Sequence, residues 1–154
     1  RIPFRGTFVR EFSEDEIRDL NNLRAALETY AVELVVEQGA NTVQALEPLY
    51  QIVEQMARID ADKDVAQTNS LHVTFHQTLQ RLAGNQLLSS VWTELEQQFW
   101  VAMRASQRSL FEEGEAIHFA DAHRALVDIV AAGDVDRFRR EIRRHVSYPA
   151  KLST

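Results

Sequence analysis

The sequence predicts an all-α domain, an antiparallel bundle of about six helices. Only five Gly and three Pro occur among its 154 residues. The stretches between them are rich in Leu, Ala, Glu, Gln and Arg, which favour helices. Apolar residues in these stretches recur every three or four positions, the period of a helix with one buried face. A chain of this length forms one ordinary domain.

The first twelve residues differ in composition from the rest. Gly6 is a turn signal ahead of the short β-prone run Thr7-Phe8-Val9. This run predicts one strand of a small hairpin. We therefore expect residues 1–12 to form a strand and linker, and residues 13–154 to form the helical domain.

The first predicted helix runs from Ser13 to about Gln38. Ser13 and Glu16 form a capping-box pattern, in which each side chain accepts from a backbone amide of the other residue. Gly39 ends the helix as a left-handed cap. Helical spacing predicts a buried apolar stripe that comprises Ile17, Leu20, Leu23, Leu27, Tyr30 or Ala31, and Leu34.

The second predicted helix begins near Asn41 or Thr42 and ends near Asp60. Pro48 lies within this range. It either kinks the helix or marks its true first turn, because the first turn is where a helix tolerates proline.

The third predicted helix runs from about Asp64 to Ala83 and ends at Gly84. Asn85 then caps the fourth helix, because its side chain can accept from a free amide of the first turn. An apolar stripe on the fourth helix comprises Leu88, Trp92, Leu95, Phe99 and Met103.

The last two predicted helices complete the bundle. The fifth spans roughly Glu115 to Ala132 and stops at Gly133. The sixth opens at Asp134 and closes near His145 with basic residues, which suit the negative end of the helix dipole.

Composition narrows the possible functions. Seventeen Lys and Arg against 23 Asp and Glu give a net charge of -6, which opposes binding of the domain as a whole to a phosphate backbone. The chain has no cysteine, which excludes disulfides, thiolate metal sites and cysteine nucleophiles. Its apolar runs are far shorter than the about 20 residues of a membrane helix. We expect a cytoplasmic protein without a membrane partner.

Four of the five histidines carry the candidate chemistry. His72 and His76 lie four residues apart on one face of the third predicted helix, a spacing that can chelate one ion. His123 is in phase with the apolar residues of the fifth helix, and His145 with those of the sixth. We expect these inward imidazoles to converge on a polar cavity in the centre of the bundle, where helix bundles build metal sites.

This histidine pattern has two interpretations. Neutral imidazoles suit zinc, nickel, copper or ferrous iron, so the ligand type alone does not choose the metal. A single inward histidine, however, is more often a hydrogen-bonded core residue than a metal ligand. Spacing and phase leave both interpretations open.

Several segments, in their order and spacing, resemble the FCD domain, the FadR-like C-terminal ligand-sensing domain of GntR-type bacterial transcription regulators. The resemblance covers about residues 13 to 148. It is carried by the segments 23–28 (LRAALE), 75–79 (FHQTL), 83–85 (AGN), 120–126 (ADAHRAL), 132–134 (AGD) and 144–145 (RH).

The segment 5–9 (RGTFV) resembles the wing strand that precedes this domain in such regulators. The helix that reads DNA is missing from the sequence. We expect a truncated chain, a proteolysed chain or a natural protein without its DNA reader. In this interpretation DNA is bound only through the missing winged-helix domain.

The resemblance implies a divalent metal, with zinc or nickel expected. In metal-containing members of the family, an Asp and a His four residues apart and two later His hold one ion. The three His correspond to His76, His123 and His145, whereas His72 stands at the position of the Asp. The ion is then held by four imidazoles. Alternatively, His72 turns away and the ion is held by three imidazoles and a water molecule or the effector. Replacing the anionic ligand leaves about one extra positive charge, which favours an anionic effector.

The resemblance also implies a small organic acid as effector, and a homodimer. Arg24 would pair with the effector's carboxylate. The alternative for Arg24 is a surface ion pair with Glu28, one helical turn later. Arg104 is a second candidate for contact with the anion. Asn85 is a third, although it is most simply a helix cap.

We therefore expect a regulatory sensor and not an enzyme. One alternative is a metal-dependent hydrolytic enzyme, because three histidines with an open coordination position can activate water. The segment 72–76 (HVTFH) lacks the Glu after the first His that serves metalloproteases as a base, which disfavours this alternative. The other alternative is a metal-free sensor of a larger apolar or acyl ligand. Metal content separates it from the metal-binding sensor.

Overall fold

The described part of the chain folds into six α-helices. The computed structural model describes the backbone of residues 12–59, 63–111 and 118–147, and within these ranges the side chains of 102–111, 118 and 147 are not described. The helices are α1 (Glu14–Glu37), α2 (Val43–Arg58), α3 (Val65–Leu82), α4 (Gln86–Phe111), α5 (His118–Ala131) and α6 (Val135–Ser147). The predicted all-α class is confirmed. The strand predicted at 1–12 lies outside the described residues, apart from Phe12.

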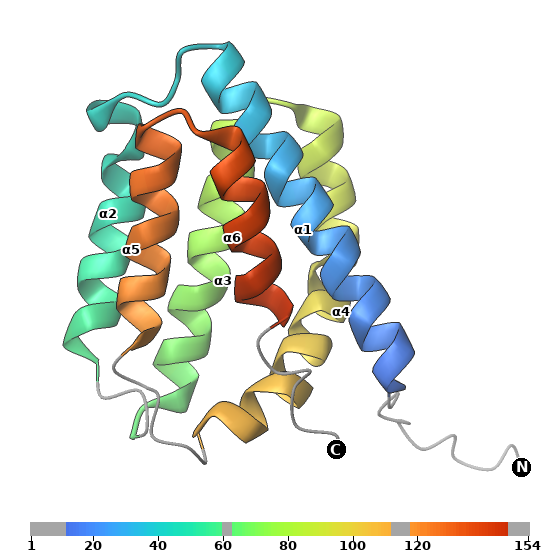
Figure 1. Cartoon of the computed structure of the whole chain (residues 1–154). Helices are drawn as coiled ribbons and strands as arrows, with labels where there is room; N and C mark the ends of the chain where they lie inside the picture. Colours follow the sequence, from blue (N-terminus) through green and yellow to red (C-terminus); the bar gives the residue numbers. More distant parts are fainter. Residues whose placement is uncertain (1–11, 60–62, 112–117, 148–154) are drawn as a thin grey trace, which may run out of the picture.

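Consecutive helices run in opposite directions, so the bundle is antiparallel as predicted (Figure 1). α1 contacts α3, α4 and α6, while α2 contacts α3 and α5. Backbone contacts of α3 with α5 or α6 are few, so side chains fill the space between them. None of the described helices is both long and apolar enough to cross a membrane.

The predicted helix ends match the structure because they depend on local hydrogen bonds. The capping box of Ser13 and Glu16 is present at the start of α1. The other caps accept a backbone amide three residues later, and they are Thr42, Asp64, Asn85 and Asp134. Glycines with positive φ follow α1, α3 and α5, and they are Gly39, Gly84 and Gly133.

Pro48 lies inside α2, because the helix begins five residues earlier at Val43. The alternative in which Pro48 marks the true first turn is therefore wrong. Thr42, one of the two predicted starting residues, is the N-cap.

α1 buries a different face from the one its leucines predict. Leu23, assigned to the buried stripe, is 42% exposed, and of the two alternatives Tyr30 and Ala31 the structure buries Ala31 and leaves Tyr30 45% exposed. The buried face instead carries several polar side chains, and it comprises Asn21, Arg24, Ala25, Glu28, Thr29, Ala31, Val32 and Val35. The physical reason is that this face contacts polar groups of the bundle interior, which hydrogen-bond its buried charges.

Candidate metal centre

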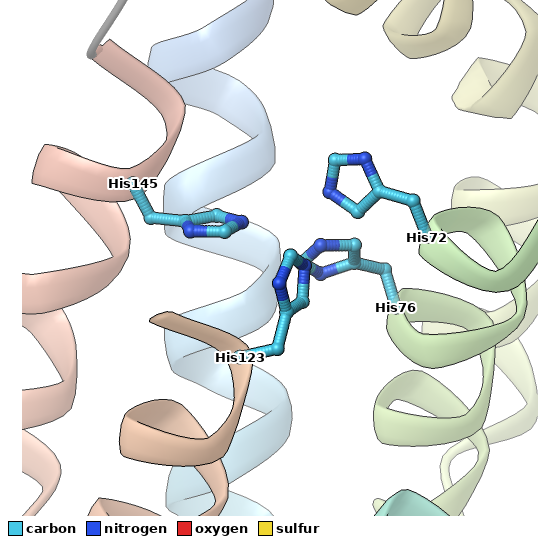
Figure 2. Close-up of side chains that lie close together, drawn as sticks. All are labelled: His72, His76, His123 and His145. Carbon is cyan, nitrogen blue, oxygen red and sulfur yellow. The ribbon is translucent and has the colours of Figure 1, made fainter. Parts of the chain in front are cut away.

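The fold brings all four predicted histidines together. Figure 2 shows their rings directed toward one another, two from α3 and one each from α5 and α6. His72, His76 and His123 are buried, and His145 is partly buried. The distances between ring centroids range from 4.6 to 5.8 Å over all pairs in the cluster. The predicted convergence of the four side chains is therefore confirmed.

The size of this histidine cluster suits one metal ion. One nitrogen from each ring lies within 4.8 Å of the corresponding nitrogens of the other three. A tetrahedral zinc ion with bonds of about 2.0–2.1 Å would hold its nitrogens about 3.4 Å apart. Small side-chain movements would therefore close the four imidazoles around an ion.

Hydrogen bonds orient two of the rings. His123 donates from Nδ1 to the carbonyl oxygen of Phe119 at 2.7 Å, one turn earlier on α5. His76 donates from Nδ1 to Oε2 of Glu28 on α1 at 2.6 Å. These bonds place the ring proton on Nδ1 and leave Nε2 with a lone pair, as metal-binding histidines require.

The Nε2 atoms of His76 and His123 are buried and have no hydrogen-bond partner in the described part of the chain. An unsatisfied buried acceptor costs about 1–3 kcal/mol. A divalent ion would satisfy both lone pairs at once. The donor set and its orientation therefore fit the metal that the sequence predicted.

The four imidazoles are neutral at pH 7. Burial lowers the pKa of His123 from 6.5 to about 4. Burial, assisted by neighbouring imidazoles and Arg24, lowers the pKa of His72, His76 and His145 well below the ordinary value. The neutral form is the one that binds metals, so the lone pairs are available at physiological pH.

Arg24 does pair with Glu28, but inside the bundle and not at its surface. Arg24 Nε donates to Glu28 Oε1 at 2.8 Å, and the two residues are 5% and 0% exposed. Burial raises the pKa of Glu28, and the positive charge of Arg24 opposes that rise. Nη2 of Arg24 is buried and has no partner among the described atoms, so one donor stays available to a ligand.

A cavity lies next to the histidine cluster, between α1, α3 and α4. Arg24, His72 and His76 line one side, and three aromatic side chains line another: Trp92, Phe99 and Trp100. Its volume is about 260 Å³ when the open mouth is counted. About 20 Å³ of this is space that a water molecule can occupy. That is room for about one ordered water molecule.

Asn85 and Arg104 are the two weaker candidates for ligand contact, and the structure describes the side chain of Asn85 alone. Asn85 accepts from the backbone amide of Leu88 at 3.0 Å and caps α4, and it does not line this cavity. The structure thus gives Asn85 its simpler predicted role. The side chain of Arg104 lies outside the described residues.

Glu28 is the residue of the site that sequence reasoning missed. It was considered only as a surface partner for Arg24, whereas it also holds His76. The available signal was that Arg24 and Glu28 share a helical face with Ala31, Val32 and Val35, a second apolar face beside the leucine stripe.

The comparisons with known proteins agree with this fold. The FCD domain family matches residues 19–148. A probable D-xylose utilization operon transcriptional repressor of Paenarthrobacter nicotinovorans is 27% identical over 144 residues, covering 92% of this chain and 60% of the relative. An uncharacterized HTH-type transcriptional regulator in unstable DNA locus of Streptomyces ambofaciens is 30% identical over 146 residues, covering 94% and 58%. The chain spans about three fifths of the length of these relatives.

Among solved structures, E. coli McbR/YncC has the same fold, with a TM-score of 0.69 and 22% identity over 93% of this chain and 68% of that chain. The family match covers most of the chain, and it includes all four clustered histidines. The chain therefore belongs to the FCD domain family of GntR-type transcription regulators, as its sequence resemblance predicted.

Proposed function

We propose that this domain is the effector-sensing part of a transcription regulator, and that it holds one divalent metal ion and a small organic acid. The observation that carries the proposal is the cluster of four imidazoles with two oriented, unsatisfied Nε2 atoms. Both curated relatives are described as transcription regulators, which favours sensing over the hydrolytic alternative.

His72, His76, His123 and His145 would hold the ion, and zinc or nickel suits four imidazoles. A bound ion would supply a positive charge and a position for a carboxylate oxygen. Four neutral ligands cancel none of the ion's charge, so an anionic effector is favoured electrostatically.

Arg24 would bind the effector's carboxylate through Nη2, because this atom is buried at the cavity and lacks a partner among the described atoms. Glu28 would hold the Arg24 guanidinium in place through its Nε. The same carboxylate of Glu28 orients His76. One buried acidic residue thus supports both the anion-binding and the metal-binding side chains.

In the whole regulator, effector binding would shift the packing of α1 against α3 and α4, which enclose the cavity. That shift would change DNA affinity through a winged-helix domain, by a coupling free energy of typically 1–3 kcal/mol. A homodimer would place two such sensors on paired half-sites.

The test is elemental analysis of protein purified without chelator. Wild type should contain about one zinc or nickel ion per chain, because one cluster of four ligands is present. His76→Ala and His123→Ala should each lose most of it. Phe75→Leu is the matched control, since Phe75 is as buried as His76 and adjacent to it but offers no ligand atom.

Less than about a tenth of an ion per wild-type chain, after incubation with zinc and with nickel, would overturn the metal proposal. Full metal content in both histidine variants would overturn the assignment of the ligands. Retention of metal by Phe75→Leu separates loss of a ligand from loss of the fold.

A further inference from the structure

The cavity beside the histidines contains an acidic group that the proposed carboxylate does not use. Glu96 on α4 lines the same cavity as Arg24, His72 and His76. Gln77 on α3 donates a hydrogen bond to Oε1 of Glu96, which holds that carboxylate at the α3 side. Among the residues that the structure describes, Glu96 has no basic partner. A purely anionic effector would therefore meet an uncompensated negative charge.

The aromatic wall next to Glu96 has the chemistry of a cation site. Trp92, Phe99 and Trp100 line the cavity, and the rings of Trp92 and Phe99 are 5.2 Å apart. The faces of aromatic rings, tryptophan above all, attract ammonium groups. A carboxylate beside aromatic faces is a suitable environment for a positively charged nitrogen.

The lining of the cavity also contains hydrogen-bond donors that a ligand would have to satisfy. Arg24 Nη2 and Trp92 Nε1 are both buried and lack a partner among the described atoms. Both groups only donate hydrogen bonds. A ligand that satisfies them carries acceptor oxygens, which a carboxylate provides.

The cavity also restricts the size of its ligand. In this structure the cavity has room for about one water molecule, so an effector must displace the side chains around it, and each further atom adds to that displacement. A ligand of few non-hydrogen atoms is therefore favoured over the acyl chain considered from the sequence.

We propose that the effector is a small zwitterion, whose carboxylate lies toward Arg24 and the histidine cluster and whose ammonium group lies between Glu96 and the aromatic side chains. The chemical class is an amino acid or a betaine. This inference rests on the proposed function and specifies the class of effector for the same site.

The experiment compares matched ligands by isothermal titration calorimetry on protein of measured metal content. Alanine and β-alanine are each compared with propionate, which lacks the amine. Glycine betaine is compared with 3,3-dimethylbutyrate, in which carbon replaces the charged nitrogen. At least one zwitterion should bind tenfold or more tightly than its partner, and Glu96→Gln should remove that preference without weakening the partner's binding.

Glu94→Gln is the matched control, because Glu94 lies on the same helix but is exposed and does not line the cavity. It should keep the preference. Carboxylates that bind as tightly as their zwitterions would overturn the inference and leave the proposed function standing. A preference that survives Glu96→Gln would overturn the role of Glu96. Binding of none of these ligands to metal-loaded protein would overturn the inference. A zwitterion preference in protein that takes up less than about a tenth of an ion per chain would support the inference and overturn the metal site.

Discussion

The charges of Arg24 and Glu28 are both enclosed by the bundle, so each depends on the other for compensation. Removing one partner of a buried ion pair costs about 3–5 kcal/mol, because the remaining charge is desolvated and unpaired. We predict that Arg24→Ala lowers the free energy of unfolding by about this amount. Urea denaturation of metal-free protein at pH 7.5 measures the change.

The double variant Arg24→Ala/Glu28→Gln is the control for this prediction. It should recover part of the loss, since a neutral amide replaces the unpaired carboxylate. A cost below about 0.5 kcal/mol for Arg24→Ala, the value typical of an exposed pair on a helix, would contradict a buried role.

Glu28 also orients His76. Substituting Glu28 therefore tests whether this hydrogen bond supports His76 as a metal ligand. We predict that Glu28→Ala weakens metal affinity about 10–100-fold, the usual effect of losing a partner of a metal-bound histidine. Glu28→Gln should lose less, because the amide oxygen still accepts from Nδ1 of His76. Competition against a chelator at pH 7.5 gives both affinities.

The variant Glu33→Ala serves as the comparison, since Glu33 lies on the same helix and pairs with Arg139 away from the cluster. Its metal affinity should equal that of wild type. Unchanged affinity in a folded Glu28→Ala protein would show that Glu28 does not support His76.

At the scale of the helices, the glycines that end α1 and α5 differ in their surroundings. Gly39 and Gly133 both have positive φ, of 66° and 70°. A Cβ at Gly39 would meet no atom within 4 Å, whereas one at Gly133 would lie 3.4 Å from Asn41 Nδ2. Since contacts at 3.4 Å or more are ordinary van der Waals contacts, we predict that Gly39→Ala and Gly133→Ala each cost about 1 kcal/mol through the backbone alone.

Thermal unfolding of the two glycine variants beside wild type provides the measurement. Because both substitutions place the same side chain in the same backbone conformation without a clash, their costs should agree within about 0.5 kcal/mol. A clearly larger loss for either variant would contradict a cost that comes from the backbone alone.

The sequence predicted the ends of the helices better than their faces. Ser13, Thr42 and Asn85 cap helices through bonds within three residues, so local sequence suffices to find them. The face of α1 depends on what the other helices present to it. Leu23 is apolar and was therefore expected in the core, but it is exposed. The interior partners of α1 include His76, so the charged side chain of Glu28 faces inward and bonds to it.

At the scale of the whole molecule, burial of the histidines makes stability depend on pH. In the unfolded chain a histidine has a pKa of about 6.5, whereas that of folded His123 is about 4 and those of His72, His76 and His145 are also lowered. Their contribution to stability is fully present above about pH 6.5. It is lost as the pH falls from 6.5 toward the folded pKa, because protons then bind preferentially to the unfolded chain.

We predict that metal-free protein loses up to about 4 kcal/mol of unfolding free energy between pH 6.5 and 5.5, at about 1 kcal/mol for each of these four histidines. His72→Phe should reduce the pH dependence by about a quarter. Urea denaturation across this range tests both statements. Stability that is constant between pH 7.5 and 5.5 would contradict the buried, neutral state of the cluster.

The sequence sufficed to predict which histidines form the candidate site. It did not suffice to predict the hydrogen bonds that orient them. The phases of His72, His76, His123 and His145 on their own helices sufficed to predict convergence, because each side chain only had to face the bundle interior. The bond from His76 to Glu28 joins residues 48 positions apart. Its formation depends on how α1 and α3 are rotated against each other, which no local pattern specifies.

The burial of the cluster has a consequence for time scales. His76 and His123 are 3% and 0% exposed, and their rings come from helices that lie far apart in the sequence. An ion held there would leave only when imidazoles on different helices release it in turn, so its exchange would be slower than diffusion through the open mouth of the adjacent cavity. Such an ion would stay through many cycles of effector binding. The metal would then act as a permanent part of the receptor, and the effector alone would report on changing conditions.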